Sequence, residues 1–504
     1  RKRRNSCANW PHEEVLMKIL FASPEAVPFA KTGGLADVAG ALPKVLAKMG
    51  HEVHLILPKY RGIDEKRFPA LPSGMVLKIP ISQKVVTGEV YALDLAPRLR
   101  VLLVRQDTYY DRDQLYGTPT GDFEDNAERF TFFSRAVVET ALELTPDIIH
   151  CNDWQTGLVP VYLKSLYRWS PALARAASVF TIHNIGYQGL FWHYDLHLTN
   201  LGWELFTPRA LEYFGKLNLL KGGIVFADAV TTVSRKYMEE IQTPEFGKGL
   251  DGVLRDRKKD LYGILNGVDY EEWSPGKDAF IKEKYDASDL ERKKACKADL
   301  QRECYLEEDP NVPLLGIISR LTDQKGFDIL APIMEDLMGL GLQFVLLGTG
   351  EEEYNLLFQK IGQKYPRQAG IRIAFDNVLA HKIEAGADMF LMPSHYEPCG
   401  LNQIYSLRYG TIPVVRATGG LDDTIDDFNP MTEEGTGFKF LDYTPPCLLE
   451  AIQRAVQVFR NRPVWEKLMV RAMAQDFSWG QSAQEYVKMY EKILTQKRNP
   501  APKP

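Results

Sequence analysis

The chain has 504 residues, 45% of them hydrophobic, and a formal net charge of -5. It is about three times longer than a usual domain, so we expect at least two hydrophobic cores and two large domains. The near-neutral charge, without basic runs interleaved with aromatic residues, argues against a nucleic-acid partner. Since no apolar run approaches the ~20 residues of a membrane span, we expect a soluble protein.

The cysteines are scattered without the paired spacing that disulfide frameworks and structural zinc sites use. We therefore expect a reducing compartment and no metal. Residues 1–16 begin with a basic stretch and lack the apolar segment of a signal peptide. We interpret them as an extension outside the folded domains, disordered or left by processing or cloning. The six cysteines are Cys7, Cys151, Cys296, Cys304, Cys399 and Cys447.

The first predicted domain covers residues 17–265 and begins as a βαβ unit. A strand at 18–23 is followed by a glycine-containing loop, a helix through 42–49 and a strand at 53–57. The alternation continues, which predicts a doubly wound sheet. Further strands are expected near 101–104, 148–151, 178–183, 229–233 and 260–265, and the longest helix at 126–144.

The second predicted domain covers residues 266–480, opens with a charged, helix-prone segment and repeats the alternation. A last helix at 482–494 follows a break at Trp479 and Gly480 and is long enough to cross back to the first domain. The fold class is thus α/β, with two doubly wound domains. The strands of the second domain are expected at 314–319, 343–347, 371–375, 389–392 and 412–416.

The stretch 393–415 joins two apolar strands through a turn and a helix. Pro398 and Gly400 force the turn, and apolar residues at helical spacing predict a helix at 401–409. Glu397 stands at the mouth of this loop, just before a helix whose free amides face the same space. This carboxylate is placed to hold hydroxyl groups.

A glycine pair follows the first strand. Gly33 and Gly34 remove the Cβ atoms that would keep a charged ligand off the backbone, and the next helix presents unpaired amides. Lys31 adds a positive charge. The alternative is a plain tight turn with a solvent-facing lysine, because the pattern is neither GxGxxG nor a P-loop.

A second group of anion-binding candidates lies in the second domain. Arg320 and Lys325 come just past the end of a strand, and the amides of Gly419 and Gly420 follow another strand. Each cation alone is more often a surface charge, but together with helix N-termini they suit a diphosphate. A diphosphate joined to a hydroxyl-rich group that Glu397 holds is a nucleotide sugar.

Seven motifs in this order and spacing resemble those of bacterial glycogen synthases and plant starch synthases, which are retaining glucosyltransferases that use ADP-glucose. The resemblance spans residues 17–494 and implies the GT-B fold, two Rossmann-like domains facing each other across a cleft. The motifs are Lys-Thr-Gly-Gly-Leu-Ala-Asp-Val at 31–38, Asn-Asp-Trp at 152–154, Thr-Ile-His-Asn-Ile at 181–185, Asn-Gly-Val-Asp at 266–269, Arg-Leu-Thr-Asp-Gln-Lys-Gly at 320–326, Glu-Pro-Cys-Gly-Leu-Asn-Gln at 397–403 and Ala-Thr-Gly-Gly-Leu at 417–421.

The resemblance implies a donor site built from both domains. Arg320 and Lys325 would bind the diphosphate, and Glu397 would hold the glucose hydroxyls. The backbone carbonyl of His183 would stabilise positive charge at the anomeric carbon, and Phe375 would pack on adenine. The other residues implied in donor binding are Lys31, Gly33, Gly34, Asp37, Asn184, Cys399, Gly400 and Leu401.

Three features depart from related patterns. Asn402 replaces a Thr of many bacterial members, a change we expect to be tolerated. Tyr405 stands where another GT-B group has a Glu that holds the nucleotide ribose, which argues against that group. Asp111 and Asp113 mimic a metal-binding DxD motif, but they lie in a polar loop and are interpreted as solvated charge.

Several residues have plainer interpretations. Without the resemblance, Asp153 and Trp154 would be a helix cap and a core aromatic, and His183 a satisfied core histidine. Cys399 is open to interpretation as a bystander thiol. His395 is expected to be exposed and unimportant.

The implied reaction moves glucose from ADP-glucose to the 4-hydroxyl at the non-reducing end of an α-1,4-glucan or malto-oligosaccharide, without a cofactor. Alternatives are a UDP-glucose-using GT-B transferase, a glucan phosphorylase, whose pyridoxal-phosphate lysine motif we do not find, and a catalytically silent glucan-binding scaffold. The intact donor-site charges argue against the last. We expect an intracellular protein of a bacterial cytoplasm or plastid stroma, and the sequence leaves its oligomeric state open.

Overall fold

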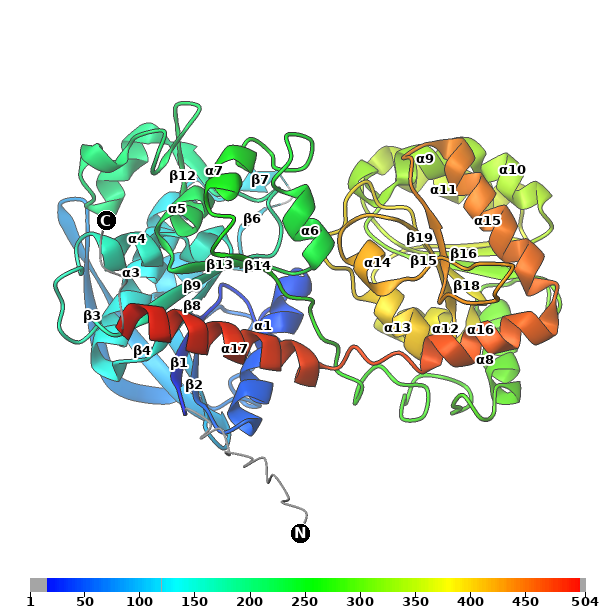
Figure 1. Cartoon of the computed structure of the whole chain (residues 1–504), viewed down its shortest axis with the longest axis horizontal. Helices are drawn as coiled ribbons and strands as arrows, with labels where there is room; N and C mark the ends of the chain where they lie inside the picture. Colours follow the sequence, from blue (N-terminus) through cyan, green and yellow to red (C-terminus); the bar gives the residue numbers. More distant parts are fainter. Residues whose placement is uncertain (1–15, 119, 499–504) are drawn as a thin grey trace, which may run out of the picture. The chain divides into compact units, whose positions relative to one another are not determined.

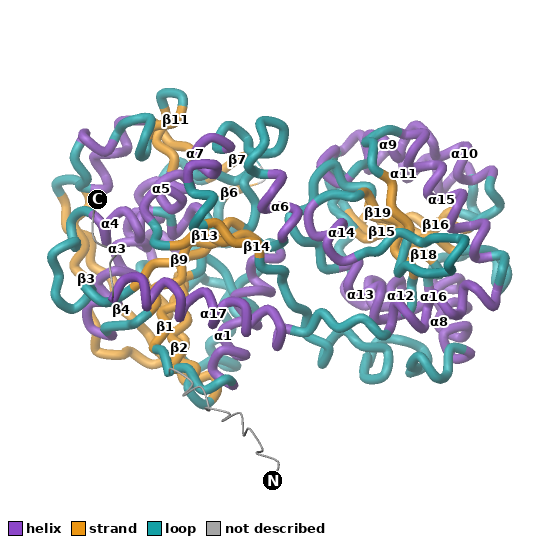
Figure 2. Tube along the Cα trace, in the orientation of Figure 1, coloured by secondary structure: helices purple, strands orange, loops and turns teal. Residues whose placement is uncertain are grey.

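The computed structural model describes residues 16–118 and 120–498 of the chain, so Cys7 and the predicted extension up to residue 15 lie outside the described residues. The chain divides into two compact units (Figures 1 and 2). The first comprises the chain up to Phe180, Gly189–Ala229 and the chain from Tyr486. The second comprises Thr181–Gln188 and Val230–Glu485. The predicted domain ranges 17–265 and 266–480 remain predictions.

The larger sheet has nine strands in the order β14-β13-β9-β8-β1-β2-β5-β4-β3. Its central strand β1 pairs in parallel with both β2 and β8. Such strands are covered on both faces, which explains their continuous apolar sequences. The strands are β1 (Lys18–Ala22), β2 (Glu52–Pro58), β3 (Leu71–Ile81), β4 (Lys84–Ala96), β5 (Leu99–Arg105), β8 (Ile148–Asn152), β9 (Ala177–Ile182), β13 (Ala229–Thr232) and β14 (Leu261–Gly263).

One edge of this sheet differs from the predicted pattern. Strands β3 and β4 form an antiparallel hairpin, and β4 is also antiparallel to β5. The hairpin alternates buried and exposed residues, as expected for a strand pair with one face in solvent. Sequence analysis did not predict these two strands, nor two small sheets made of β10 (Leu190–Trp192), β12 (Lys216–Asn218) and β11 (Glu212–Tyr213), and of β6 (Gly117–Thr118) and β7 (Gly121–Asp122).

Among the described residues, helices α1 to α5 lie entirely in the first unit. The longest, α3, runs over the predicted range, and α1 begins at the second glycine of the predicted anion site. They are α1 (Gly34–Lys48), α2 (Asp107–Tyr110), α3 (Asn126–Leu144), α4 (Leu158–Lys164) and α5 (Leu219–Phe226).

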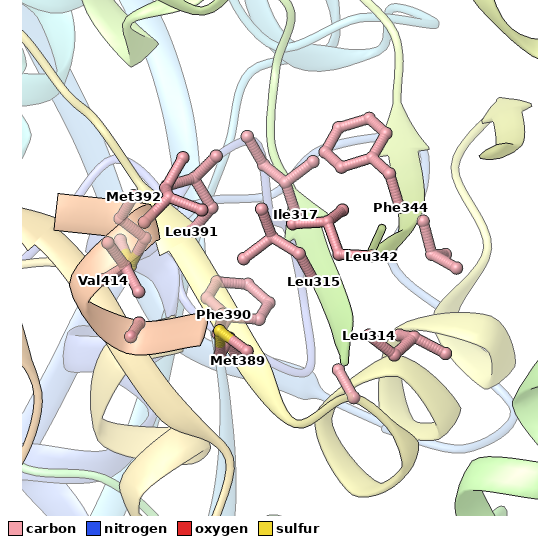
Figure 3. Packing of buried hydrophobic residues seen from close by; sticks show 14 of the residues in the cluster. Leu314, Leu315, Ile317, Leu342, Phe344, Met389, Phe390, Leu391, Met392 and Val414 are labelled. Atoms are coloured by element: carbon pink, nitrogen blue, oxygen red, sulfur yellow. The ribbon is translucent and has the colours of Figure 1, made fainter. Parts of the chain in front are cut away.

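The second unit is built on a six-stranded parallel sheet with the order β17-β16-β15-β18-β19-β20. In Figure 1, α9, α10 and α11 lie on one side of it, and α8, α12 and α13 lie on the other. Figure 3 shows Leu315 and Ile317 of β15 among side chains of β18 such as Phe390 and Leu391, all buried. The strands are β15 (Leu314–Ile318), β16 (Gln343–Gly348), β17 (Ala369–Ile373), β18 (Met389–Met392), β19 (Ile412–Arg416) and β20 (Phe438–Phe440).

Helices flank these strands on the pattern expected of a doubly wound domain. Helix α13 ends at Gly410, whose φ of +65° is the left-handed cap that glycine favours. The flanking helices are α8 (Glu291–Glu303), α9 (Phe327–Leu330), α10 (Met334–Gly339), α11 (Glu352–Lys364), α12 (Asn377–Gly386), α13 (Asn402–Tyr409), α14 (Gly419–Thr424), α15 (Pro445–Phe459) and α16 (Arg462–Met473). Two other helices, α6 (Arg235–Glu240) and α7 (Asp251–Asp256), lie between β13 and β14 in the chain, and α6 contacts β14 of the nine-stranded sheet.

The last helix, α17 (Trp479–Arg498), is longer than predicted, and its residues from Tyr486 onward belong to the first unit. There Tyr490 contacts His150 of β8, with 2.6 Å between the hydroxyl and Nδ1. The predicted break at Trp479 and Gly480 is wrong, because both residues lie in the first turn of the helix. Among the described residues, no helix is both long and apolar enough to cross a membrane.

Candidate active site

A cavity of about 140 Å³ lies at the carboxyl ends of β15 and β18. The strand order runs outward from β15 on one side and from β18 on the other, so these ends form the topological switch point of the sheet. Ligands of open α/β sheets bind at such points. The cavity is lined by Ile317, Ile318, Ser319, Arg320, Lys325, Leu391, Met392, Pro393, Ser394, Glu397, Gly400, Leu401 and Asn402.

Two of the predicted residues form an ion pair in this cavity. Lys325 Nζ donates to Glu397 Oε2 at 2.6 Å, and the hydroxyl of Ser394 donates to the same oxygen at 3.0 Å. The carboxylate side chain is only 8% exposed and the lysine 20%. Because both charges are largely withdrawn from water, removing either one leaves the other uncompensated, which is costly.

Close packing of two loops brings these charges together. Lys325 ends the short 3₁₀ helix Asp323–Lys325, and Gly326 follows with a φ of +83°. A Cβ atom at Gly326 would lie 2.1 Å from the carbonyl oxygen of Pro393, so only glycine permits this approach. The amide of His395 also donates to the carbonyl of Gln324 at 2.9 Å.

The backbone around Glu397 is held by donors from neighbouring elements. The hydroxyl of Ser234 donates to the carbonyl of Pro398 at 2.6 Å, and the side-chain amide of Gln403 donates to the carbonyl of Cys399 at 3.0 Å. Gly400 adopts a φ of +71° just before α13. The predicted turn into the helix is therefore confirmed.

Cys399 contributes backbone, not a reactive thiol. Its side chain is buried, and burial raises the pKa of the thiol to about 12. The thiol is therefore protonated at neutral pH and is not a nucleophile.

Arg320 and Phe375 are the more exposed of the predicted donor residues in this unit. Arg320 Nη1 lies 3.5 Å from the hydroxyl of Tyr187 and lines the cavity. Phe375 was predicted as the last residue of a strand, but β17 ends two residues earlier, at Ile373, and the Phe375 side chain is 91% exposed. Its role in packing on a base stays a prediction.

His183 and Asn184 belong to the second unit, on the segment that follows β9. His183 is buried, and burial lowers its pKa to about 3, so the imidazole is neutral at physiological pH. Asn184 hydrogen-bonds the hydroxyl of Tyr396, the residue before Glu397, and also accepts from the amide of Gly186 at 2.9 Å. Asn184 thus lies beside the Glu397 loop.

The first unit holds the other predicted residues. Lys31 forms a 2.7 Å ion pair with Asp37 in the first turn of α1, and both side chains remain partly exposed. A Cβ atom at Gly33 or at Gly34 would meet nothing within 4 Å. The backbone at this helix N-terminus is therefore open to a ligand.

A buried carboxylate supports this glycine loop. Glu25 Oε2 accepts hydrogen bonds from the amide and the hydroxyl of Thr32, at 2.6 and 2.8 Å. Burial raises the pKa of Glu25 to about 7, against the opposing effect of these hydrogen bonds. Nothing in the sequence pattern singles out this residue.

The amides of the glycine pair of α14 have partners within the chain. The amide of Gly419 donates to the carboxylate of Glu240 at 3.1 Å, and that of Gly420 donates to the carbonyl of Glu397 at 3.1 Å. The role of these amides in binding a diphosphate stays a prediction.

Of the plainer interpretations, one is confirmed and two are wrong. Trp154 is a buried aromatic against Phe130, as expected, but Asp153 makes no side-chain capping hydrogen bond and has a φ of +56°, so the cap interpretation is wrong. His395 is not exposed, because it is partly buried and stacks on Tyr443 at 4.5 Å.

The structure also shows the contacts made at two of the departures from related patterns. Asp111 and Asp113 are exposed and both pair with Arg61, so they are surface charge as predicted. Tyr405 is buried and stacks on Trp273 at 4.2 Å. It contributes to packing.

Three residues in or around the Glu397 loop were not predicted from the sequence. Ser394 and Tyr396 lie within the motif that holds Glu397, so their position in the loop was the available signal. Glu240 had no such signal, because it is 179 positions from the amide that it binds. Within the described residues, no group of three or more His, Cys, Asp and Glu side chains is arranged to hold a metal ion.

Known proteins resemble both halves of this arrangement. The family description "Starch synthase catalytic domain" matches residues 18–256, and "Glycosyl transferases group 1" matches residues 305–458. The glycogen synthase of Koribacter versatilis is 51% identical over 96% of this chain and 100% of its own length. That of Moorella thermoacetica is 49% identical over 96% of this chain and 98% of its own.

A solved structure extends the likeness to the fold. The catalytic domain of starch synthase IV from Arabidopsis thaliana, bound to ADP and acarbose, matches with a TM-score of 0.87 and 33% identity, over 95% of this chain and 100% of that one. Two α/β units with a site at a switch point therefore define a glycosyltransferase of the GT-B fold class. Within that class, the chain belongs to the family of glycogen synthases and starch synthases, enzymes that transfer glucosyl units.

Proposed function

We propose that this enzyme transfers glucose from ADP-glucose to the 4-hydroxyl at the non-reducing end of an α-1,4-glucan, with retention of configuration. The observation that carries the proposal is the meeting of Arg320, Lys325 and Glu397 on one cavity at the switch point. The starch synthase IV that resembles this chain is bound to ADP and acarbose, which supports an adenine nucleotide donor and a glucan acceptor.

The cations of the cavity act on the leaving group. Arg320 and Lys325 neutralise the charge that grows on the departing diphosphate, which is electrostatic stabilisation of the transition state. Lys325 is held in place by Glu397 at 2.6 Å, so its ammonium is pre-positioned rather than free to rotate. Pre-positioned charge needs no reorganisation at the moment of reaction.

Glu397 holds the glucose hydroxyls, together with the backbone of Cys399, Gly400 and Leu401. With Lys325 and Ser394 on one of its oxygens, this carboxylate is fixed as a hydrogen-bond acceptor. We infer a same-face transfer in which the departing phosphate oxygen takes the proton of the acceptor hydroxyl. The carbonyl of His183 then stabilises positive charge at the anomeric carbon.

Further donor contacts are proposed on three other elements. Lys31, Asp37 and the amides at Gly33 and Gly34 form an anion site in the first unit, supported by the open space at both glycines. Phe375 packs on adenine, supported by its exposed ring, and Asn184 faces the donor sugar beside Tyr396.

The test compares ADP-glucose with UDP-glucose in the presence of a glucan primer, following nucleotide release and the configuration of the new linkage. We expect transfer from ADP-glucose to exceed that from UDP-glucose and to give an α-linkage. Preference for UDP-glucose would overturn the proposed donor, and a β-linkage would overturn retention.

A variant locates the reaction in the cavity. Lys325→Ala should lower kcat/KM by about 100- to 1000-fold, since it removes one donor to the transition-state charge. The matched control is Lys360→Ala, an exposed lysine of α11. Lys325→Ala with turnover close to that of the control would contradict the assignment.

A further inference from the structure

Helices α6 and α14 of the second unit cap each other's first turns. The carboxylate of Glu240 in α6 accepts from the amide of Gly419 at 3.1 Å and from the hydroxyl of Thr418 at 3.0 Å. In return, the carboxylate of Asp423 in α14 accepts from the amides of Arg235 and Lys236, at 2.6 and 3.0 Å. We call these contacts the α6–α14 clasp.

Glu240 is the buried half of this clasp. Glu240 is only 8% exposed, whereas its neighbour Glu239 is exposed to solvent. Both carboxylate oxygens lie within 3.2 Å of the amide of Gly419 and of the hydroxyl of Thr418. These two donors fix the buried carboxylate in place. Without the carboxylate, the buried amide of Gly419 would be unpaired, which costs the full free energy of its desolvation.

The clasp continues directly into the loop of Glu397. The amide of Gly420 donates to the carbonyl of Glu397 at 3.1 Å. A Cβ atom at Gly419 would lie 1.9 Å from that carbonyl oxygen, and one at Gly420 would lie 2.0 Å from the carbonyl oxygen of Cys399. The start of α14 is thus pressed against residues 397–399, and both glycines are required for that contact.

A second contact from the same segment reaches the same loop. Ser234, the N-cap of α6, donates its hydroxyl to the carbonyl of Pro398 at 2.6 Å and accepts from the amide of Tyr237 at 3.2 Å. Residues 234–240 therefore hold the backbone of 397–399 in two ways, directly through Ser234 and through the clasp at Thr418–Gly420.

We propose that Glu240 is a positioning residue of the glucosyl transfer, which fixes the backbone beneath Glu397 through Thr418, Gly419 and Gly420. The inference rests on the proposed role of Glu397 in holding the glucose of the donor. Glu240 does not line the cavity. It keeps the carboxylate of Glu397 in the place from which it meets both Lys325 and the sugar.

The clasp separates two parts of donor binding. Arg320 and Lys325 lie on the loop after β15, which the clasp does not contact in the hydrogen bonds described above. Loss of Glu240 should therefore displace the groups that hold the sugar, and with Glu397 it should disturb the bonded Lys325, but it should leave Arg320 in place. Affinity for ADP should fall much less than the transfer of glucose.

The test compares Glu240→Gln with Glu239→Gln, a control on the same helix that is exposed. We expect kcat/KM of Glu240→Gln to fall about 10- to 100-fold, the effect of displacing a binding group by up to about 1 Å. Its dissociation constant for ADP, measured by calorimetry, should rise by a much smaller factor, because Arg320 is not displaced. Thermal unfolding of both variants checks that they are folded.

If Glu240 only stabilised the fold, its substitution would change neither kcat/KM nor the dissociation constant for ADP relative to the wild type. If Glu240→Gln matched Glu239→Gln in kcat/KM, or lost ADP affinity in parallel with activity, the inference would be overturned. Thr418→Val, which removes one of the two donors, provides a milder second variant and should show the same split to a smaller extent. If wild-type enzyme used UDP-glucose instead of ADP-glucose, only the donor proposal would fall, and the same comparison would be made with UDP and UDP-glucose.

Discussion

Two glycine pairs look alike in the sequence and differ in what surrounds them. At Gly33 and Gly34, in the first unit, a Cβ atom would meet nothing within 4 Å. At Gly419 and Gly420, in the second unit, a Cβ atom would collide with a backbone carbonyl oxygen at 2.0 Å or less. Glycine leaves space for a ligand at the first pair, and it permits the chain to pack against itself at the second.

The surrounding polar groups show the same difference. The second pair has its amides engaged by Glu240 and by the carbonyl of Glu397. At the first pair, the nearby carboxylate of Glu25 instead binds Thr32, one residue before the glycines. A glycine pair after a strand therefore indicates close approach to the backbone, and only the structure shows whether a ligand or the chain itself approaches.

The largest expected effect on stability concerns Glu25, which supports the loop before Gly33 and Gly34. Burial raises the pKa of Glu25 from 4.5 to about 7, so the native state binds the proton more tightly than the unfolded state does. This contribution to stability is complete below pH 4.5 and is lost as the pH rises to about 7, by roughly 3 kcal/mol. Glu25→Gln does not titrate, and its Tm relative to wild type should rise by several degrees between pH 5 and pH 8.

Calorimetric scans at four pH values measure this difference. The exposed Glu143→Gln of α3 is the control and should follow the wild type at every pH. A Tm difference that is independent of pH would mean that Glu25 does not titrate in this range in the native protein.

The next prediction tests the close packing at Gly419 and Gly420. Gly420→Ala places a methyl group where the carbonyl oxygen of Cys399 lies, and a backbone atom cannot move aside as a flexible side chain would. We expect a loss of about 1–3 kcal/mol in the free energy of unfolding, as for other overpacked sites. Because the shift reaches residues 397–399, kcat/KM should fall as well. A Tm and kcat/KM equal to those of the wild type would show that this contact is not tight in solution.

Part of the fold could be predicted from the sequence. Strands β18 and β19 lie within the predicted ranges because buried parallel strands read as continuous apolar runs. The hairpin of β3 and β4 was missed because its alternation is interrupted by Pro72, Gly74 and Gly88. Its exposed face also lacks the apolar run that marks a buried strand.

The site could be predicted in outline and not in detail. The rule that ligands bind at the carboxyl ends of parallel strands placed Lys325 and Glu397 at one edge of the sheet. The ion pair between them and the hydrogen bond from the Gly419 amide to Glu240 join residues that are 72 and 179 positions apart. No local pattern encodes such contacts, because they arise only when the loops pack.

The smallest expected effect on stability is at Gly33 and Gly34. It decides whether this glycine pair is a ligand site or a plain tight turn. Gly34→Ala adds a methyl group that meets no atom within 4 Å, at the first residue of α1. Alanine is the better helix former by roughly 0.5–1 kcal/mol, so the Tm should stay the same or rise slightly. If a diphosphate approaches these amides, the same methyl group blocks it, and KM for the nucleotide sugar should rise about tenfold, the equivalent of about one charge-assisted hydrogen bond. Gly339→Ala, in α10, is the matched control because its Cβ atom also meets nothing within 4 Å. An unchanged KM in Gly34→Ala would favour the plain tight turn, since a ligand site at this backbone cannot tolerate the added carbon.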